Sequence, residues 1–170
     1  EFKREHPDYA VVAYINTSTE LKAVCDVCVT SSSALKIVEK LPQKNILFIP
    51  DKNLGSFVRA KLPQKNIVLW DGCCPVHNAI TEEEVLSAKT EHPQAKLLMH
   101  PELPAGVIRH ADLVGSTADI IRYATTHDED CIIGTEKSIA DYLSLACPQN
   151  RYYPLSKKLM CPDMRITNLT

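Results

Sequence analysis

The stretch Ala10-Val11-Val12-Ala13-Tyr14-Ile15 decides the fold, because it is a short apolar run with no charged residue in it. A run of this length that does not alternate with polar residues is typical of a strand buried on both faces of a sheet. Runs of the same kind recur along the chain at residues 27–29, 46–49, 67–70, 97–99, 113–114 and 132–133. Short buried strands that alternate with helical patterns predict parallel sheets and an α/β fold.

Helix signals fall between these strands. Ser31-Ser32-Ser33 has the composition of a helix cap and is expected to open a helix that buries Ala34, Leu35 and Val38. A second helix is expected over residues 81–89, with three glutamates in its first turn, where the helix dipole favours them. Ser116-Thr117 is predicted to cap a third helix, at residues 118–124.

The composition is that of an ordinary globular protein. Of the 170 residues, 45% are hydrophobic and 24% are charged, which excludes a disordered or collagen-like chain. The formal net charge is -2, so there is no basic excess to track a phosphate backbone, and we expect no nucleic-acid partner. The apolar runs are far shorter than the ~20 residues that a membrane span needs, so we expect no membrane contact.

The cysteines favour a reducing compartment. There are seven of them, and this odd number, without a secretion signal, argues against a disulfide framework and for a cytoplasmic location. Cys25-x-x-Cys28 has the spacing of half a zinc site, but no second pair follows at a matching distance. A redox pair is disfavoured, since Asp26-Val27 between the thiols resembles a strand edge. We predict that Cys25, Cys131 and Cys147 are buried structural thiols.

The two halves of the chain repeat the same order of residues. Asp26 matches Asp112, Ser31 matches Thr117 and Tyr14-x-Asn16 matches His100-x-Glu102, all 86 positions apart, while Asp51 matches Glu136 at 85 and Cys74 matches Cys161 at 87. This periodicity predicts two pseudo-repeated, three-layer (αβα) Rossmann-like domains with small parallel sheets. Their expected bounds are 1–76 and 77–155, followed by a C-terminal tail at 156–170.

Polar residues gather where ligands bind in such folds. Ligands of open parallel sheets lie beyond the carboxyl ends of the strands, and four residues lie at such ends: Tyr14, Asn16, His100 and Glu102. Ser31 and Thr117 lie at expected helix N-termini, whose N–H groups attract anions. His100 titrates near neutrality and is a candidate for proton transfer, and Tyr14 is a candidate donor to a carbonyl. Together these residues predict a polar pocket for an anionic ligand.

Each repeat closes with one cysteine. Cys74 lies in Gly72-Cys73-Cys74-Pro75, and Cys161 lies in Met160-Cys161-Pro162. One thiol per repeat is an unusual pattern for zinc but suits an iron–sulfur cluster held between pseudo-symmetric domains. Two thiolates are too few for the usual ligand set of such a cluster.

A series of motifs resembles the quinolinate synthase (NadA) family, in order and over residues 9–164. They are Tyr14-Ile15-Asn16-Thr17, Asp26-x-Cys28-x-Thr30-Ser31-Ser32, Pro50-Asp51-Lys52-Asn53-Leu54-Gly55, Trp70-x-Gly72-x-Cys74-x-Val76-His77, His100-Pro101-Glu102, Ala111-Asp112-x-Val114-Gly115-Ser116-Thr117 and Gly134-Thr135-Glu136. Each motif is weak alone, but seven in the same order are specific.

The resemblance implies an enzyme, a transferase of de novo NAD biosynthesis. The family condenses iminoaspartate, supplied by L-aspartate oxidase, with dihydroxyacetone phosphate to form quinolinate, phosphate and water. It has three pseudo-symmetric α/β domains around one [4Fe–4S] cluster, whose open iron acts as a Lewis acid. By the same resemblance, Cys74 and Cys161 would be two cluster ligands, and Tyr14, His100 and Glu102 would be catalytic. The substrate site would comprise Tyr14, Ile15, Asn16, Ser31, His100, Pro101, Glu102, Ser116 and Thr117.

The family's first domain, with its own cysteine ligand, has no counterpart in this sequence. The chain starts with a charged segment that runs into His6-Pro7, which we interpret as the end of a helix cut from a longer protein. The third cluster ligand is therefore expected from that first domain. Two other hypotheses stay open: a non-enzymatic two-domain module that binds a small dicarboxylate or phosphate, and a zinc-stabilised domain that uses Cys25 and Cys28.

Overall fold

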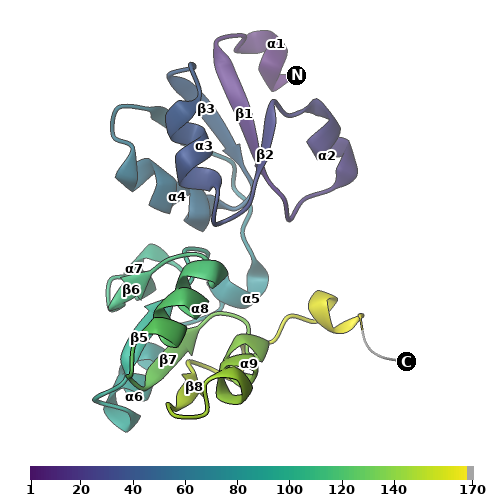
Figure 1. Cartoon of the computed structure of the whole chain (residues 1–170). Helices are drawn as coiled ribbons and strands as arrows, with labels where there is room; N and C mark the ends of the chain where they lie inside the picture. Colours follow the sequence, from purple (N-terminus) through teal and green to yellow (C-terminus); the bar gives the residue numbers. More distant parts are fainter. Residues whose placement is uncertain (168–170) are drawn as a thin grey trace. The chain divides into compact units, whose positions relative to one another are not determined.

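The computed structural model describes residues 1–167 and divides into two compact units, Glu1–Cys74 and a second unit that begins at Pro75 (Figure 1). Each unit contains one four-stranded sheet in which every neighbouring pair of strands is parallel. Helices connect the strands, so each unit is a small Rossmann-like α/β domain, as the sequence predicts. Within the described residues, no helix combines the length and apolar character that crossing a membrane requires.

The first unit has the strand order β2-β1-β3-β4. Its strands are β1 (Tyr9–Tyr14), β2 (Val27–Val29), β3 (Asn45–Ile49) and β4 (Asn66–Leu69), and its helices are α1 (Phe2–Glu5), α2 (Thr19–Val24), α3 (Ala34–Lys40) and α4 (Lys52–Lys61). Because side chains alternate along a strand, Val12 of β1 packs with residues of α3 and α4, whereas Val11 faces the opposite side. That opposite side is covered by Phe2 of α1 and by Cys25.

The second unit repeats this order as β6-β5-β7-β8. Its elements are α5 (Pro75–Asn78), α6 (Glu82–Glu91), β5 (Lys96–Met99), α7 (Ala105–Ile108), β6 (Leu113–Val114), α8 (Thr117–Thr126), β7 (Cys131–Gly134), α9 (Ser138–Ala146), β8 (Tyr152–Pro154) and the 3-10 turn η1 (Asp163–Arg165). Residues of α6 and α7 pack on one face of the sheet, and residues of α8 and α9 pack on the other. Both faces of the strands are therefore buried, as their uninterrupted apolar sequences predict.

Backbone hydrogen bonds show that the two units are repeats of one structure. The Val11 N–H donates to Asp26 Oδ2 at 2.7 Å, and the Asp26 N–H donates to the Val11 carbonyl at 2.9 Å. In the second unit, the Leu97 N–H donates to Asp112 Oδ2 and the Asp112 N–H donates to the Leu97 carbonyl, both at 2.8 Å. The same two-way clamp joins strand to strand at positions 86 residues apart.

A second pair of bonds repeats just before the predicted cluster cysteines. The Lys52 N–H donates to the Gly72 carbonyl at 2.7 Å, and the Lys137 N–H donates to the Leu159 carbonyl, also at 2.7 Å. Gly72 and Leu159 each precede a cysteine, Cys74 or Cys161, by two residues. Each unit therefore holds its cysteine-bearing segment to the start of an equivalent helix.

The ends of the predicted elements need correction. The first strand ends at Tyr14, and Ile15, which the apolar run includes, is 46% exposed. The fourth strand ends at Leu69, and Trp70 is 60% exposed. Apolar side chains extend both runs, but the sheet ends where polar loops begin. The last strand, β8, starts at Tyr152 and is absent from the predicted strands, because it ends in a proline, which argues against a strand.

Candidate functional site

The residues that follow β5 are buried, although they are polar. The strand ends at Met99, and the turn His100-Pro101-Glu102 follows it directly. His100 is 3% exposed and Glu102 is 4% exposed, so neither is the solvated turn residue that this tripeptide alone would suggest. A buried carboxylate is costly unless other groups donate hydrogen bonds to it. The hydrogen-bond partners of the Glu102 carboxylate therefore define the site.

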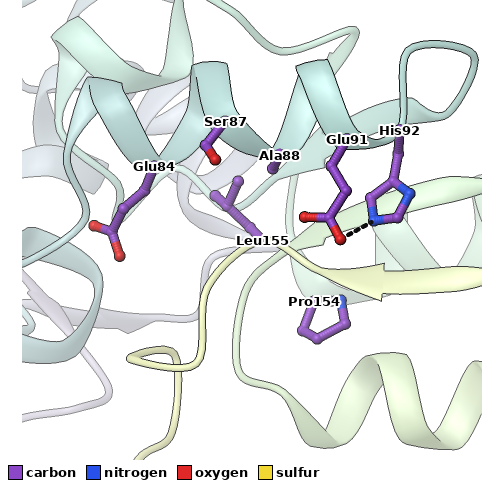
Figure 2. Close-up of a pocket in the computed structure, with 7 residues that line it drawn as sticks. All are labelled: Glu84, Ser87, Ala88, Glu91, His92, Pro154 and Leu155. Carbon is purple, nitrogen blue, oxygen red and sulfur yellow. Dashed lines mark ion pairs between the residues drawn. The ribbon is translucent and has the colours of Figure 1, made fainter.

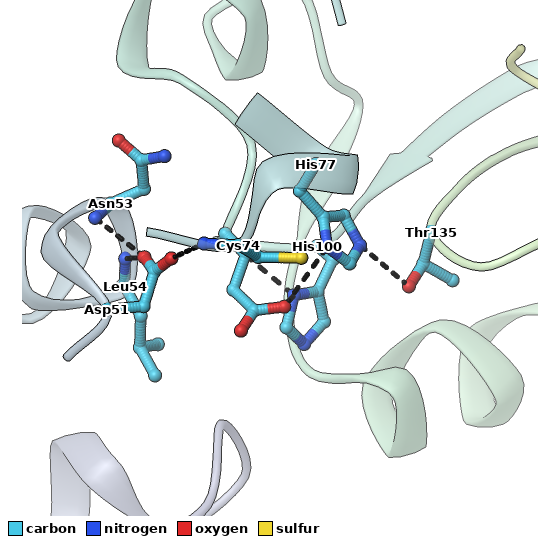
Figure 3. Close-up of polar contacts among 8 residues, drawn as sticks. Asp51, Asn53, Leu54, Cys74, His77, His100 and Thr135 are labelled. Atoms are coloured by element: carbon cyan, nitrogen blue, oxygen red, sulfur yellow. Dashed lines mark hydrogen bonds and ion pairs between the residues drawn. The ribbon is translucent and has the colours of Figure 1, made fainter. Parts of the chain in front are cut away.

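His77 of α5 is a partner of that carboxylate. Its Nδ1 lies 3.1 Å from Glu102 Oε2, and its Nε2 lies 3.3 Å from the hydroxyl oxygen of Thr135, which follows β7 (Figure 3). The carboxylate can only accept, so we assign the His77 proton to Nδ1. Nε2 then shares a hydrogen bond with the Thr135 hydroxyl. Side chains from three separate segments of the chain thus fix one imidazole–carboxylate pair.

His100 packs against this pair. Its ring centroid lies 5.2 Å from that of His77. Its Nδ1 is 3.3 Å from the Glu102 backbone nitrogen and 3.4 Å from Glu102 Oε2. One nitrogen cannot accept from the N–H and donate to the carboxylate at once, and the hydrogen bond from the Glu102 N–H makes Nδ1 the acceptor. Burial lowers the pKa of His100 to about 4, against the opposing influence of Glu102, and His77 lowers it further. The ring is therefore neutral at pH 7, with Nδ1 as the acceptor and the proton on Nε2.

The sequence predicts His100 and Glu102 as site residues but not the roles of His77 and Thr135. A signal was available for His77, which follows Cys74 by three residues, a spacing that brings side chains together on one turn of helix. Thr135 gave no comparable signal, because its contact with His77 spans 58 residues. Only the parallel pairing of β5 with β7 brings the ends of these strands together.

Cys74, the last residue of the first unit, is held by a buried aspartate. Asp51, at the N-cap of α4, is 2% exposed. Its Oδ1 accepts from the N–H groups of Asn53 and Leu54 at 2.7 and 2.9 Å, and its Oδ2 accepts from the Cys74 N–H at 2.6 Å (Figure 3). Hydrogen bonds from N–H groups to a buried carboxylate are charge-assisted and strong. Asp51 therefore fixes the backbone from which the Cys74 thiol projects.

Cys74 also belongs to a group of ligand atoms suited to a metal. One ligand atom each from Cys74, His77 and Glu102 lies within 4.8 Å of the other two. Among residues 1–167, no other group of three or more histidine, cysteine, aspartate or glutamate side chains meets this distance. The pair Cys25 and Cys28 has no such third ligand in the described part of the chain, which leaves the zinc hypothesis without support. Thiolate is the usual protein ligand of iron–sulfur clusters, so the chemistry of Cys74 fits that cofactor.

Cys161 is the matching thiol of the second unit. It is partly buried and follows Leu159, whose carbonyl accepts the Lys137 N–H. All seven cysteines, which lie within residues 1–167, are free thiols. The prediction of buried structural thiols is confirmed for Cys131, whereas Cys25 and Cys147 are only partly buried.

The predicted site residues of the first unit differ in exposure. Tyr14 is buried at the end of β1, whereas Ile15 and Asn16 are exposed. Ser31 lies in a turn and not at the helix N-terminus, because α3 begins at Ala34 with Ser33 as its N-cap. The predicted serine cap is therefore wrong in detail: the Ser33 hydroxyl makes no cap hydrogen bond and instead accepts from the Thr30 N–H at 2.9 Å.

The matching helix of the second unit is capped as the sequence predicts. Ser116 is the N-cap of α8 and is buried, and Thr117 is the first helical residue. The Ser116 side chain accepts from the Asp119 N–H, while the Asp119 carboxylate accepts from the Ser116 N–H and hydroxyl. This capping box brings a carboxylate into the first turn, where an anionic ligand would otherwise bind. Pro101, between His100 and Glu102, is buried.

A pocket of about 180 Å³ lies elsewhere in the second unit (Figure 2). It is lined by Glu84, Ser87, Ala88, Glu91, His92, Pro154 and Leu155. The Glu84 carboxylate accepts a hydrogen bond from the Ser156 hydroxyl at 2.7 Å and forms an ion pair with Lys158 Nζ at 3.2 Å. His92 stacks on Tyr153 with 3.5 Å between ring centroids. These contacts are structural, and we assign no chemistry to this pocket.

The fold and the site together define a class: a duplicated α/β protein with a buried imidazole–carboxylate cluster at the carboxyl end of its second sheet. The chain belongs to the quinolinate synthetase A (NadA) family, whose sequence model matches residues 1–170. The resemblance seen in the motifs is thereby confirmed.

Individual relatives agree with this membership. The chain is 46% identical over 168 residues to a quinolinate synthase of Caldicellulosiruptor saccharolyticus, covering 98% of this chain and 55% of the relative. It is 43% identical over 170 residues to a quinolinate synthase of Clostridioides difficile, covering 99% and 56%. It is also 43% identical over 175 residues to one from Sulfurihydrogenibium sp., covering 99% and 57%. The chain thus spans little more than half the length of the curated relatives it matches.

Proposed function

We propose that this chain supplies two of the three domains of a quinolinate synthase, which condenses iminoaspartate with dihydroxyacetone phosphate to form quinolinate, phosphate and water. The buried His77–Glu102–His100 cluster carries this proposal, together with membership of the family. A buried carboxylate supported by imidazole is suited to proton transfer, and ring formation from these substrates requires repeated removal of protons from carbon, nitrogen and oxygen.

In this proposal, Glu102 is the proton acceptor and His77 stabilises its charged form through the 3.1 Å contact. His100, neutral and protonated on Nε2, donates a hydrogen bond to a substrate oxygen. Tyr14 assists the isomerisation of the triose carbonyl. The remaining proposed substrate contacts are Ile15, Asn16, Ser31, Pro101, Ser116 and Thr117.

Cys74 and Cys161 are proposed as two ligands of a [4Fe–4S] cluster, with the third thiolate from a part of the protein outside this chain. Their equivalent places in the two repeats support this assignment, since Lys52 and Lys137 hold the preceding segments by the same 2.7 Å bond. When bound, the cluster would supply a Lewis acid that polarises a substrate oxygen. Asp51 would hold the Cys74 backbone in place through its 2.6 Å hydrogen bond.

The proposed setting follows from the same family assignment. Iminoaspartate would come from L-aspartate oxidase, because the imine hydrolyses in water and needs a nearby source. The proposed location is the cytoplasm, as the odd number of cysteines in the sequence favours.

The test is Glu102→Gln in the complete protein that carries this chain, assayed anaerobically for quinolinate. An amide keeps the size of the carboxylate but cannot take a proton, so we expect kcat to fall by about 10²–10⁴-fold, the usual contribution of a general acid or base. Glu91→Gln is the matched control, because that side chain lies on the surface of α6 and is 74% exposed. Unchanged turnover in Glu102→Gln would remove the proposed role, and binding of substrates without turnover in the parent protein would favour the non-enzymatic binding module.

A further inference from the structure

Two thiols of the first unit face each other outside the candidate site. Cys25 is the C-cap residue of α2, Cys28 lies in the edge strand β2, and their Sγ atoms are 3.5 Å apart. Cys28 is exposed and Cys25 is partly buried. The strand-like residues between them, which argued against a redox pair in the sequence, do not keep the thiols apart.

Secondary structure fixes the backbone on which both thiols are carried. The Cys25 N–H donates to the Leu21 carbonyl at 3.1 Å and so closes α2. Asp26 is clamped to Val11 in both directions, and Cys28 pairs with Ala13 in the parallel register of β1 and β2. The short distance between the sulfurs is therefore a consequence of the helix end and the strand, and does not depend on a flexible loop.

The second repeat shows that this backbone does not need thiols. The residues 86 positions after Cys25 and Cys28 are Ala111 and Val114. They flank Asp112, which makes the same two-way clamp, with Leu97, at 2.8 Å in both directions. The same structure thus forms with alanine and valine, so folding alone does not explain a pair of cysteines in the first repeat.

We propose that Cys25 and Cys28 form a reversible dithiol–disulfide site that reacts with peroxide. A disulfide has a sulfur–sulfur bond of about 2.05 Å, so the two sulfurs, now 3.5 Å apart, have only a short distance to close. The proposal does not rest on the proposed enzymatic function.

The exposed Cys28 is the first to react. Its thiolate attacks one oxygen of hydrogen peroxide, the O–O bond breaks, and Cys28 sulfenic acid and hydroxide form, the hydroxide taking up the thiol's proton as water. Cys25 Sγ then attacks the Cys28 sulfur, the S–O bond breaks, and a second water leaves with the Cys25 proton. In total, two thiols lose two electrons and two protons, and one peroxide becomes two waters. Burial, followed by the contact with Cys28, raises the pKa of Cys25, which makes Cys25 the less reactive of the two thiols toward peroxide in the first step.

The test follows one tryptic peptide of the purified chain. Residues 23–36 lie between Lys22 and the cleavage site after Lys36, and contain Cys25 and Cys28 but no other cysteine. The reduced chain is treated with stepwise equivalents of hydrogen peroxide, alkylated and analysed by mass spectrometry. We expect this peptide to lose two hydrogens and its reactivity with the alkylating reagent before Cys147 is modified, and dithiothreitol to restore both thiols.

Variants taken from the second repeat sharpen the test. Cys25→Ala removes the resolving thiol, so a dimedone-reactive sulfenic acid should persist at Cys28, whereas Cys28→Val should leave Cys25 largely unreactive.

The double variant Cys25→Ala/Cys28→Val should fold with an unchanged circular dichroism spectrum. If it fails to fold, the core requires the thiols, and the parent peptide alone decides the matter. Two alkylated cysteines in that peptide after peroxide has oxidised Cys147, or disulfides from it to other cysteines, would overturn the proposal. Iron content and turnover do not enter this readout, so failure of the proposed function would be seen separately.

Discussion

The two units share a backbone but differ in the chemistry at the ends of their first strands. In the first unit, β1 ends at Tyr14, which is buried, and Asn16 two residues later is exposed. In the second, β5 leads into His100 and Glu102, which are buried and in contact with each other. The residues match at an offset of 86, and the clamps Val11–Asp26 and Leu97–Asp112 hold both strands in the same way. The two units thus share the same backbone hydrogen bonds, although the buried histidine and glutamate follow the first strand of the second unit alone.

The two strand ends also differ in the free-energy cost of their polar side chains. Exposed polar side chains such as Asn16 cost little, because water satisfies them. A buried cluster must satisfy each donor and acceptor within the protein, and a partly satisfied one is destabilising. The second unit meets this demand through α5, whose His77 contacts both Glu102 and Thr135. The first unit instead uses its buried carboxylate, Asp51, on backbone N–H groups.

The largest effect on stability is expected from removing His77. His77→Leu leaves the Glu102 carboxylate buried without the imidazole, and breaking a buried pair in this way costs about 3–5 kcal/mol. Denaturant unfolding followed by hydrogen exchange should locate the loss in the second unit. The double variant His77→Leu/Glu102→Leu should recover part of it, because no buried charge remains. Equal instability of the single and double variants would show that the pair is not the cause.

A smaller effect on stability should distinguish the N-terminus of α8 from that of α3. Ser116→Ala removes the capping box of α8 and should lower the free energy of unfolding by about 1 kcal/mol, as is usual for an N-cap. Ser31→Ala, at the matched region of the first unit, should leave stability nearly unchanged, since Ser31 lies before the helix and is not its cap. Thermal melts of both variants measure this. If the two substitutions cost the same, the helix starts do not differ as described.

The smallest effect concerns the clamps and appears as a pH dependence. Burial alone would raise the pKa of Asp26, but the hydrogen bonds from Lys3 and the Val11 N–H outweigh it and lower the pKa. A lowered pKa in the folded state stabilises the protein above the ordinary aspartate value of 3.8, and this contribution is lost as the pH falls through the folded pKa. Asp26→Asn should therefore be less stable than the parent at pH 7, with the difference vanishing in acid.

Asp112→Asn is the control for that measurement. Among the ion pairs within residues 1–167, a lysine contacts Asp26 at 2.6 Å and none involves Asp112. An asparagine oxygen still accepts the Leu97 N–H, and no contact with a lysine is lost, so this variant should cost less stability at pH 7 than Asp26→Asn. Equal pH profiles for the two variants would indicate that Lys3 contributes nothing.

The sequence was sufficient for the fold because the strands are apolar throughout and the repeat is regular. Asp26 with Asp112 and Cys74 with Cys161 were matched from spacing alone. The two aspartates make the same backbone clamp, and the residues two positions before the two cysteines accept the same backbone hydrogen bond. The strand ends were less predictable, since Ile15 and Trp70 extend apolar runs into loops. The contact of His77 with Thr135 depends on strand pairing, which spacing does not encode. The 3.5 Å approach of Cys25 to Cys28 likewise depends on where α2 ends.

The most direct test of the central claim is the iron and sulfide content of the complete protein that carries this chain, purified anaerobically and assayed for quinolinate formation. We expect about four irons in the parent protein, as a [4Fe–4S] cluster requires. Cys74→Ser and Cys161→Ser should each lose most of the iron and the turnover, whereas Cys147→Ser, outside the proposed ligand set, should keep both. Iron content and turnover that stay unchanged in both Cys74→Ser and Cys161→Ser would contradict the assignment of one cluster ligand to each repeat.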